Sequence, residues 1–248
     1  MMKKRTLIVP IMGMALAVAC GGHQPAAEAG LYDFAQDSTD ATTIYGLACD
    51  GCNDTIVVLL RNIESDPDTF YILDASRQKQ VFGHLRIGDM LAVVRNADDS
   101  ARADKVIDLD DLKATWCYEV LPTLRKRADV SEADARQLLA KMPESLKDSL
   151  LVPREYGFQL KSENKVTPVG MSYQSKTSDE ETPFEYPPLK RYRQWRLKGG
   201  QLILTETMRD SVGNILPVSS DTADLVLLRP DTLVLRFGDE VKGYYKKE

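Results

Sequence analysis

The sequence is poor in the residues on which most enzymes depend. Its 248 residues include only two histidines, His23 and His84, and only four cysteines. A hydrolytic triad places a histidine beside a serine or cysteine nucleophile, and neither histidine lies in a recognisable motif of that kind. The sequence has no glycine-rich phosphate loop, no Gly-x-Ser-x-Gly turn and no His-Glu-x-x-His helix. We therefore expect a protein without catalytic residues.

Long apolar runs are also missing, except near the N-terminus. Basic residues 3–5 precede an apolar stretch, Leu7–Val18, that is too short to span a bilayer as a stable helix. The small residues Ala17-Val18-Ala19 before Cys20 resemble the bacterial lipobox. This resemblance implies cleavage before Cys20 and acylation of its thiol, which would anchor the protein to a membrane. The alternative is a plain secretory signal that leaves Cys20 free.

Residues 1–20 are therefore expected to be a lipoprotein signal peptide and residues 21–43 a flexible tether. The tether is rich in small and polar residues and poor in large apolar ones. Gly21 stands where an Asp retains enterobacterial lipoproteins in the inner membrane, and the acidic run that marks surface export in Bacteroidetes-type lipoproteins is missing. By this resemblance we expect a lipid anchor in the outer membrane, with the protein facing the periplasm.

An excess of basic residues is missing as well. Removing Lys3, Lys4 and Arg5 with the signal leaves 29 of the 32 basic residues against 37 acidic ones, a net charge of −8. Nucleic-acid binding relies on Lys and Arg that neutralise phosphates. The basic and aromatic stretch Arg191–Lys198 is explained by strand alternation, with Trp195 facing inward and Arg196 facing solvent. We therefore expect no nucleic-acid partner.

Residues 44–110 have the pattern of a small β-domain. Short apolar runs rich in β-branched and aromatic residues alternate with turn signals, which is typical of strands. These runs are Ile44–Tyr45, Thr55–Leu60, Phe70–Leu73, Met90–Val94 and Val106–Leu109. The Gly88-Asp89 turn before the fourth run, and the polar hairpin after it, resemble the late strands of OB-type barrels. The resemblance implies an OB-like barrel; another five-stranded meander is the alternative.

Cys49 and Cys52 form a Cys-x-x-Cys motif inside this domain. In an exported protein, two thiols at this spacing form a disulfide or bind a soft metal. Zinc needs four ligands and finds only two here, whereas Cu(I) can be held by two thiolates and is the only cofactor that the motif suggests. Thioredoxin-like exchange needs the motif at a helix start in a βαβ unit, and the sequence shows no such unit.

The stretch Tyr45–Cys52 also resembles the first strand of NlpE-type lipoproteins, which are outer-membrane proteins of envelope stress and copper resistance. That motif usually has proline before the first cysteine, where this chain has Ala48. It also lies in a lipocalin-like barrel and not in an OB-like one. The resemblance implies an alternative function, in which the pair Cys49 and Cys52 senses envelope stress or handles copper.

Residues 111–248 resemble a lipocalin-like barrel. Leu112, Ala114 and Trp116 are similar to the Leu-x-Gly-x-Trp opening of such barrels, which implies that Trp116 plugs the closed end; an ordinary core aromatic is the alternative. Over roughly the last 60 residues, hairpins around Lys198–Gln201 and Arg229–Thr232 resemble the lipocalin-like domains of Bacteroidetes lipoproteins. Helical spacing predicts an insertion at about residues 131–151 that lies over the barrel mouth or packs on its wall.

The pattern also predicts how the two domains join. The run Val106–Leu109 closes the first barrel and Leu112–Trp116 opens the second, so we expect a direct strand-to-strand connection with a groove at the junction. Cys117 lies at this join and is expected either to be a buried, inert thiol or to pair with Cys49 or Cys52.

The expected protein is mostly β, with a small OB-like barrel followed by a lipocalin-like antiparallel β-barrel that carries a helical insertion. Its expected function is that of a non-catalytic, lipid-anchored binding lipoprotein of the cell envelope, whose second barrel holds a small apolar ligand or contacts an envelope protein. The alternatives are an envelope-stress or copper-handling lipoprotein acting through Cys49 and Cys52, and a purely structural interaction protein.

Overall fold

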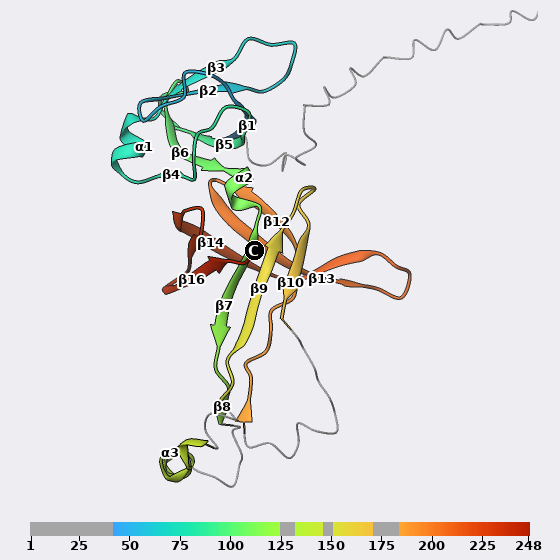
Figure 1. Cartoon of the computed structure of the whole chain (residues 1–248). Helices are drawn as coiled ribbons and strands as arrows, with labels where there is room; N and C mark the ends of the chain where they lie inside the picture. The colour runs from blue at the N-terminus through green and yellow to red at the C-terminus, as the bar shows by residue number, and fades with distance from the viewer. Residues whose placement is uncertain (1–41, 125–131, 146–150, 171–183) are drawn as a thin grey trace, which may run out of the picture.

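The computed structural model describes residues 42–124, 132–145, 151–170 and 184–248. The described chain is built almost entirely of strands, and Figure 1 shows two β-barrels stacked end to end, with the later one below the earlier one. The predicted fold class is therefore confirmed. The expected signal peptide, including Cys20, and nearly all of the expected tether lie outside the described residues.

The first barrel contains six strands and one short helix. These are β1 (Thr43–Ala48), β2 (Ile56–Leu60), β3 (Asp68–Tyr71), α1 (Leu73–Arg77), β4 (Val81–Phe82), β5 (Met90–Arg95) and β6 (Ala103–Asp108). The strands follow the order β3-β2-β1-β5-β6-β4, and β4 pairs with β6 in parallel while the other pairs are antiparallel. Alternate residues of β2 are buried, as Val57 and Leu59 show.

A parallel bridge between Tyr71 and Arg102 brings the end of β3 beside the start of β6. The Tyr71 backbone N–H donates to the Ala101 carbonyl at 2.9 Å. The five strands β1, β2, β3, β6 and β5 thus follow one another around a nearly closed sheet, with α1 after β3. This is the arrangement of the OB-type Greek-key barrel.

The predicted direct join between the barrels is wrong, because a single helical turn, α2 (Leu109–Leu112), separates β6 from β7 (Thr115–Val120). The Asp108 side chain accepts hydrogen bonds from the backbone N–H groups of Asp110 and Asp111 at 2.8 and 3.0 Å, which is an N-cap. Leu109 and Leu112 are completely buried. The cap and these two leucines stabilise a helical turn where the apolar pattern suggested extended chain.

The second barrel is an eight-stranded, antiparallel, up-and-down meander. After β7, its strands are β9 (Arg154–Leu160), β10 (Val166–Val169), β12 (Tyr192–Lys198), β13 (Gln201–Arg209), β14 (Ile215–Leu228), β15 (Thr232–Phe237) and β16 (Glu240–Lys246). The last strand, β16, pairs with the first, β7. Strands β10 and β12 meet at a bridge between Lys165 and Gln194, where the Trp195 N–H donates to the Asn164 carbonyl at 2.9 Å, so the barrel is nearly closed.

Two strands of this barrel approach each other unusually closely at Gly157. A Cβ atom at this position would lie 2.0 Å from the Trp116 carbonyl oxygen. Only glycine fits here, since that oxygen belongs to the backbone of β7 and cannot move aside.

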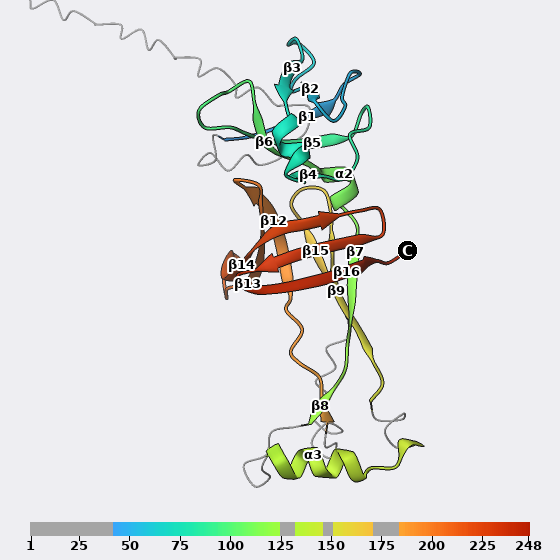
Figure 2. The ribbon, with the colours of Figure 1, turned by 90° about the vertical axis from the view of Figure 1, so that its left-hand side faces the viewer.

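The predicted helical insertion is present as α3 (Glu132–Lys141), but its expected position is wrong. Figures 1 and 2 both show α3 at the far end of the molecule, beyond a small sheet of β8 (Thr123–Leu124) and β11 (Phe184–Glu185), and apart from the barrel. The chain continues past the barrel into β8 before α3 begins, which carries the helix away from the mouth. The predicted second helix, Glu144–Leu151, lies largely outside the described residues.

The two barrels share one buried apolar cluster. Phe82 and Ile107 of the first barrel and Leu112 of α2 belong to the same cluster as Trp116 and Leu160 of the second barrel. At the same junction the Lys105 ammonium donates to the Gly200 carbonyl at 3.1 Å, which places the β12–β13 turn against the first barrel. The barrels are therefore joined by packing as well as by the chain.

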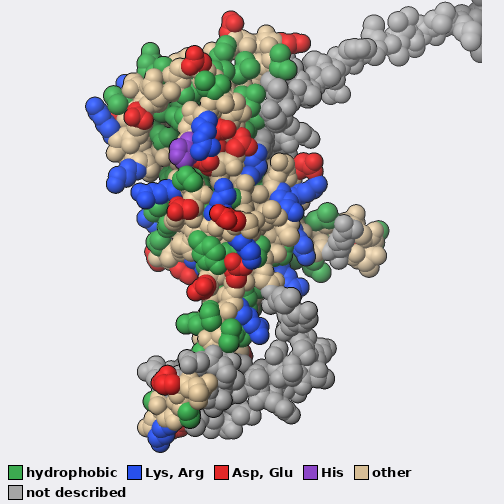
Figure 3. Space-filling view, viewed as in Figure 1, with side chains coloured by type: hydrophobic (Ala, Val, Ile, Leu, Met, Phe, Trp, Pro, Cys, Tyr) green, Lys and Arg blue, Asp and Glu red, His purple; other side chains and the backbone are tan. Residues whose placement is uncertain are grey.

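The described surface carries charges of both signs as well as exposed apolar side chains. Figure 3 shows basic and acidic side chains interspersed over the visible face of both barrels. Among the described residues, no helix is both long and apolar enough to span a bilayer.

Candidate ligand-binding site

A cavity of about 480 Å³ lies in the second barrel, at the end remote from the first barrel. The direction of β7 fixes this position: Trp116 lies near α2, whereas Tyr118 and the residues after it, which line the cavity, follow further along the strand. At the end next to α2, by contrast, the barrel interior is filled by side chains, among them Trp116, Leu202 and Leu233, all completely buried.

Four aromatic rings from four different strands form the wall of the cavity. Tyr118 of β7, Phe158 of β9, Tyr192 of β12 and Tyr244 of β16 are in successive contact. The ring centroids are 5.4 Å apart for Tyr118 and Tyr244, 5.2 Å for Phe158 and Tyr244, and 6.2 Å for Phe158 and Tyr192. Edge-on and tilted packing of this kind makes a firm apolar surface.

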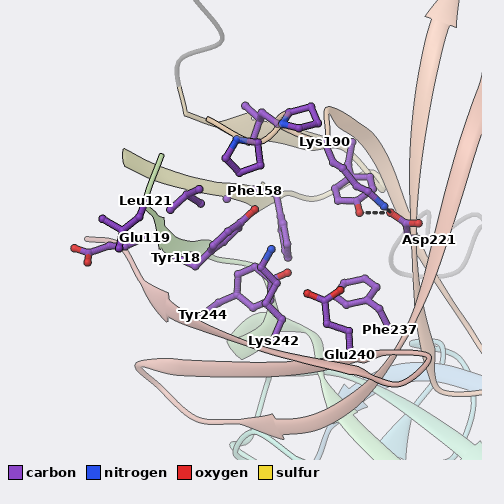
Figure 4. A pocket seen from close by; sticks show the side chains of 16 residues that line it. Tyr118, Glu119, Leu121, Phe158, Lys190, Asp221, Phe237, Glu240, Lys242 and Tyr244 are labelled. Atoms are coloured by element: carbon purple, nitrogen blue, oxygen red, sulfur yellow. Dashed lines mark hydrogen bonds and ion pairs between the residues drawn. The ribbon is translucent and has the colours of Figure 1, made fainter. Parts of the chain in front are cut away.

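The Lys242 side chain enters this aromatic wall. Its ammonium lies 3.4 Å from the centroid of the Tyr118 ring and 5.8 Å from that of Tyr244. Figure 4 shows Lys242 beside Tyr244 among the residues around the cavity. Lys242 and Tyr244 face the same side of β16 because they are two residues apart.

The second cation of the cavity, Lys190, is paired. Asp221 accepts hydrogen bonds from Lys190 and from the Tyr192 hydroxyl. Burial raises the pKa of Asp221, but these two hydrogen bonds outweigh it and hold that pKa below its ordinary value. Burial and then the bond to the Asp221 carboxylate raise the pKa of Tyr192. The charges of Lys190 and Asp221 therefore cancel, and the Tyr192 hydroxyl is bonded to the same carboxylate.

Two further carboxylates, Glu119 and Glu240, line the cavity but are exposed to solvent. The Tyr244 hydroxyl remains protonated, because burial and then the neighbouring Tyr118 and Glu240 raise its pKa. The cavity therefore offers an aromatic wall, the cation Lys242 within that wall, the paired charges of Lys190 and Asp221, and two solvent-exposed carboxylates.

The predicted pair Cys49 and Cys52 lies in the turn between β1 and β2. This turn belongs to the first barrel, and neither cysteine lines the cavity. Both thiols are free and half-buried. The Cys52 sulfur accepts a hydrogen bond from the Val58 N–H at 3.3 Å. Within the described ranges, no group of three or more His, Cys, Asp or Glu side chains is placed to hold a metal ion. A disulfide or a two-thiolate Cu(I) site therefore stays a prediction.

The other residues that the sequence singled out lie near the junction. Trp116 is completely buried at the end of the barrel next to α2, and its indole N–H donates to the Leu112 carbonyl at 2.9 Å. Cys117 is a completely buried free thiol, and burial, with the nearby Glu155 carboxylate, raises its pKa to about 11. His84, which follows β4 of the first barrel, pairs with Asp111 of α2 at 2.7 Å.

A second, shallower cavity of about 470 Å³ lies at the junction, where a groove was expected, beside Asp110 and Lys113 and along residues 160–165. Four of its charged groups are paired with each other: Lys113 with Asp110 at 2.6 Å, and Lys165 with Glu163. This groove carries less chemistry for a ligand than the aromatic cavity does.

Sequence reasoning did not identify the residues of the aromatic cavity. The signal that could have found them is the alternation of side chains along a strand. Lys242 and Tyr244 share the inward side of β16, so a lysine occupies a position where the inside of a barrel usually has an apolar side chain. Finding the cavity also needs the barrel to be closed, because its four rings come from four strands.

The strand order defines a lipocalin-like, eight-stranded up-and-down barrel attached to an OB-like barrel. No family model and no curated protein matches the sequence. Among solved structures, a lipocalin-like protein from Bacteroides thetaiotaomicron VPI-5482 is similar over 55% of this chain and 97% of its own, with 16% identity and a TM-score of 0.28. The architecture of this chain is defined by its own strand pairing.

Proposed function

We propose that this protein is a non-catalytic binding protein whose second barrel holds a small, largely apolar ligand. The observation that carries the proposal is the aromatic cavity of about 480 Å³ in a barrel otherwise filled by side chains. Small-molecule sites are typically concave, of this size, and lined by apolar and aromatic groups with a few polar ones. An envelope protein bound at the same mouth is the alternative partner.

The location of this function is proposed from the sequence. The lipobox resemblance at Cys20 supports a lipid anchor, and residues 21–43 would then act as the tether between the membrane and the barrels. We place the protein at the periplasmic face of an outer membrane. There a tethered barrel would hold an apolar molecule close to the bilayer.

The binding proposal can be tested with N-phenyl-1-naphthylamine, a neutral dye that fluoresces in apolar sites. We expect the chain from residue 21 onward to bind this dye with saturation. In Leu121→Trp a larger side chain enters the cavity edge, where Leu121 is 60% exposed, and we expect the dye to bind at least about tenfold more weakly.

The matched control is Leu216→Trp, which places the same substitution on the exposed β13–β14 hairpin, where Leu216 is 46% exposed and does not line the cavity. Its dye affinity should equal that of the native protein. Absence of saturable dye binding by the native chain, or equal weakening in both variants, would overturn the proposed function.

A further inference from the structure

The half-buried Lys242 has no carboxylate partner among the described residues. Its ammonium lies over the Tyr118 ring at 3.4 Å and has Tyr244 as its other aromatic neighbour, at 5.8 Å. Ring faces attract a cation, and the ammonium is not among the buried side-chain atoms that lack a hydrogen-bond partner, so it still reaches the water of the cavity. Among the described residues no carboxylate pairs with Lys242, so its donors are open to a ligand that enters the cavity.

The remaining charges of the cavity are accounted for. Lys190 is bound to Asp221, which also accepts from Tyr192. Glu119 and Glu240 are exposed to solvent, although the Glu240 charge lies near enough to Tyr244 to help raise the pKa of its hydroxyl. Among the described residues that line the cavity, Lys242 is the only cation outside the Lys190–Asp221 pair, so it is the group that can pair with an anionic ligand.

From this arrangement we infer that the cavity recognises an amphiphilic carboxylate, whose anionic head binds Lys242 while its apolar body lies against Phe158 and Tyr192. The inference deepens the proposed function and rests on it. The hydroxyl of Tyr244, buried beside Lys242, is a second donor for the head group.

The geometry argues against a cationic ligand. Aromatic boxes bind ligand cations over their ring faces, but here the face of Tyr118 is already covered by Lys242. A second cation would also meet the repulsion of that ammonium. A dianionic head group would need more than one available cation, and the described cavity offers a single one. A monoanion therefore fits best.

The test compares three molecules that differ only in their head group: decanoate, decan-1-ol and decylamine. Each displaces N-phenyl-1-naphthylamine from the chain of residues 21–248, below its own aggregation concentration. We expect decanoate to displace the dye at about tenfold lower concentration than decan-1-ol, as a charge-assisted hydrogen bond predicts, and decylamine to be the weakest.

Lys242→Gln should abolish the preference for decanoate over decan-1-ol while leaving the affinity for the neutral dye within about twofold. Lys242→Arg keeps the charge and should keep the preference, which shows that any loss in the glutamine variant is not a folding defect. Lys246→Gln is the matched control, because Lys246 lies on the same strand but does not line the cavity.

Equal displacement by the acid and the alcohol in the native protein would overturn the inference while dye binding leaves the proposed function intact. A decanoate preference that survives in Lys242→Gln would overturn it as well. Failure of the dye to bind at all would instead remove the proposed function.

Discussion

Asp108 stands where the chain passes from the first barrel to α2, and its carboxyl group is completely buried. One oxygen caps α2 through the N–H groups of Asp110 and Asp111, and the other has no hydrogen-bond partner. Burial, which outweighs the two capping bonds, together with the nearby charges of Asp111 and Asp89, raises the pKa of Asp108 to about 6. This residue therefore couples the inter-barrel connection to pH.

Because the pKa of Asp108 is higher in the folded protein than in the unfolded chain, protonation favours folding. The stabilisation is complete below the ordinary pKa of an aspartate and is lost as pH rises through about 6. We expect Asp108→Asn, which keeps a capping oxygen, to remove this part of the pH dependence, at most about 3 kcal/mol between pH 4 and 8.

The measurement is the free energy of unfolding in urea for both proteins across that range. The difference between the two curves isolates Asp108 from the other titrating groups. Parallel curves would show that the Asp108 carboxyl does not titrate as its burial implies.

At the scale of elements, the hairpins were the most predictable part of the fold. The turns at Lys198–Gln201 and Arg229–Thr232 connect the strand pairs that the sequence predicted, β12–β13 and β14–β15. The first half of β14 was missed because Ile215–Ser220 are all exposed, so that this part of the strand extends with β13 as a hairpin without a buried face. Strand signals depend on one buried face, and a hairpin solvated on both faces lacks that signal.

The β1–β2 turn contains two thiols that differ from the third in accessibility. Cys49 and Cys52 are half-buried, whereas Cys117 in β7 is completely buried with a pKa raised to about 11. In the reduced chain from residue 21 onward, we expect iodoacetamide to label two cysteines in the folded state and the third only after unfolding, because the thiolate is the reactive form. Mass spectrometry counts the labels.

The Cys49→Ser variant should take up one label fewer when folded, and Cys117→Ser should label like the native protein. Rapid labelling of Cys117 in the folded chain would contradict its burial. The same assay tests the copper alternative: protection of both turn thiols by Cu(I) would support it, and labelling unchanged by Cu(I) would remove it.

At the scale of the whole molecule, the apolar cluster that the two barrels share predicts that they unfold as one cooperative unit. Leu109, Leu112 and Trp116 form the centre of the junction and are completely buried. Separating the barrels would expose these side chains to water at about 25 cal/mol for each Å² of apolar surface. Neither barrel can therefore open at the junction without destabilising the other.

We expect a single unfolding transition for the chain from residue 21 onward. Native-state hydrogen exchange should give the same limiting free energy of opening for the central strands of both barrels, such as β1 and β15. Two separate plateaus, or a first barrel that opens well before the second, would show that the junction does not couple them.

The sequence by itself determined what depends on short-range pattern: a mostly β chain, the positions of most strands and the buried status of Trp116. The OB-like and lipocalin-like barrels were expected from resemblance, and the order of their strands came from the structure. Export and lipid attachment at Cys20 remain predictions from sequence alone. Such strand predictions succeed where a strand has one apolar face, because apolar and polar residues then alternate along the sequence.

Only the tertiary structure decided how distant residues meet. It revealed the helical turn capped by Asp108, the place of α3 away from the barrel mouth, and the cavity in which Lys242 lies among rings from four strands. Tyr118 and Tyr244 are far apart in the chain and become neighbours only because β16 closes the barrel on β7. The ligand site is thus a product of barrel closure, which no local pattern encodes.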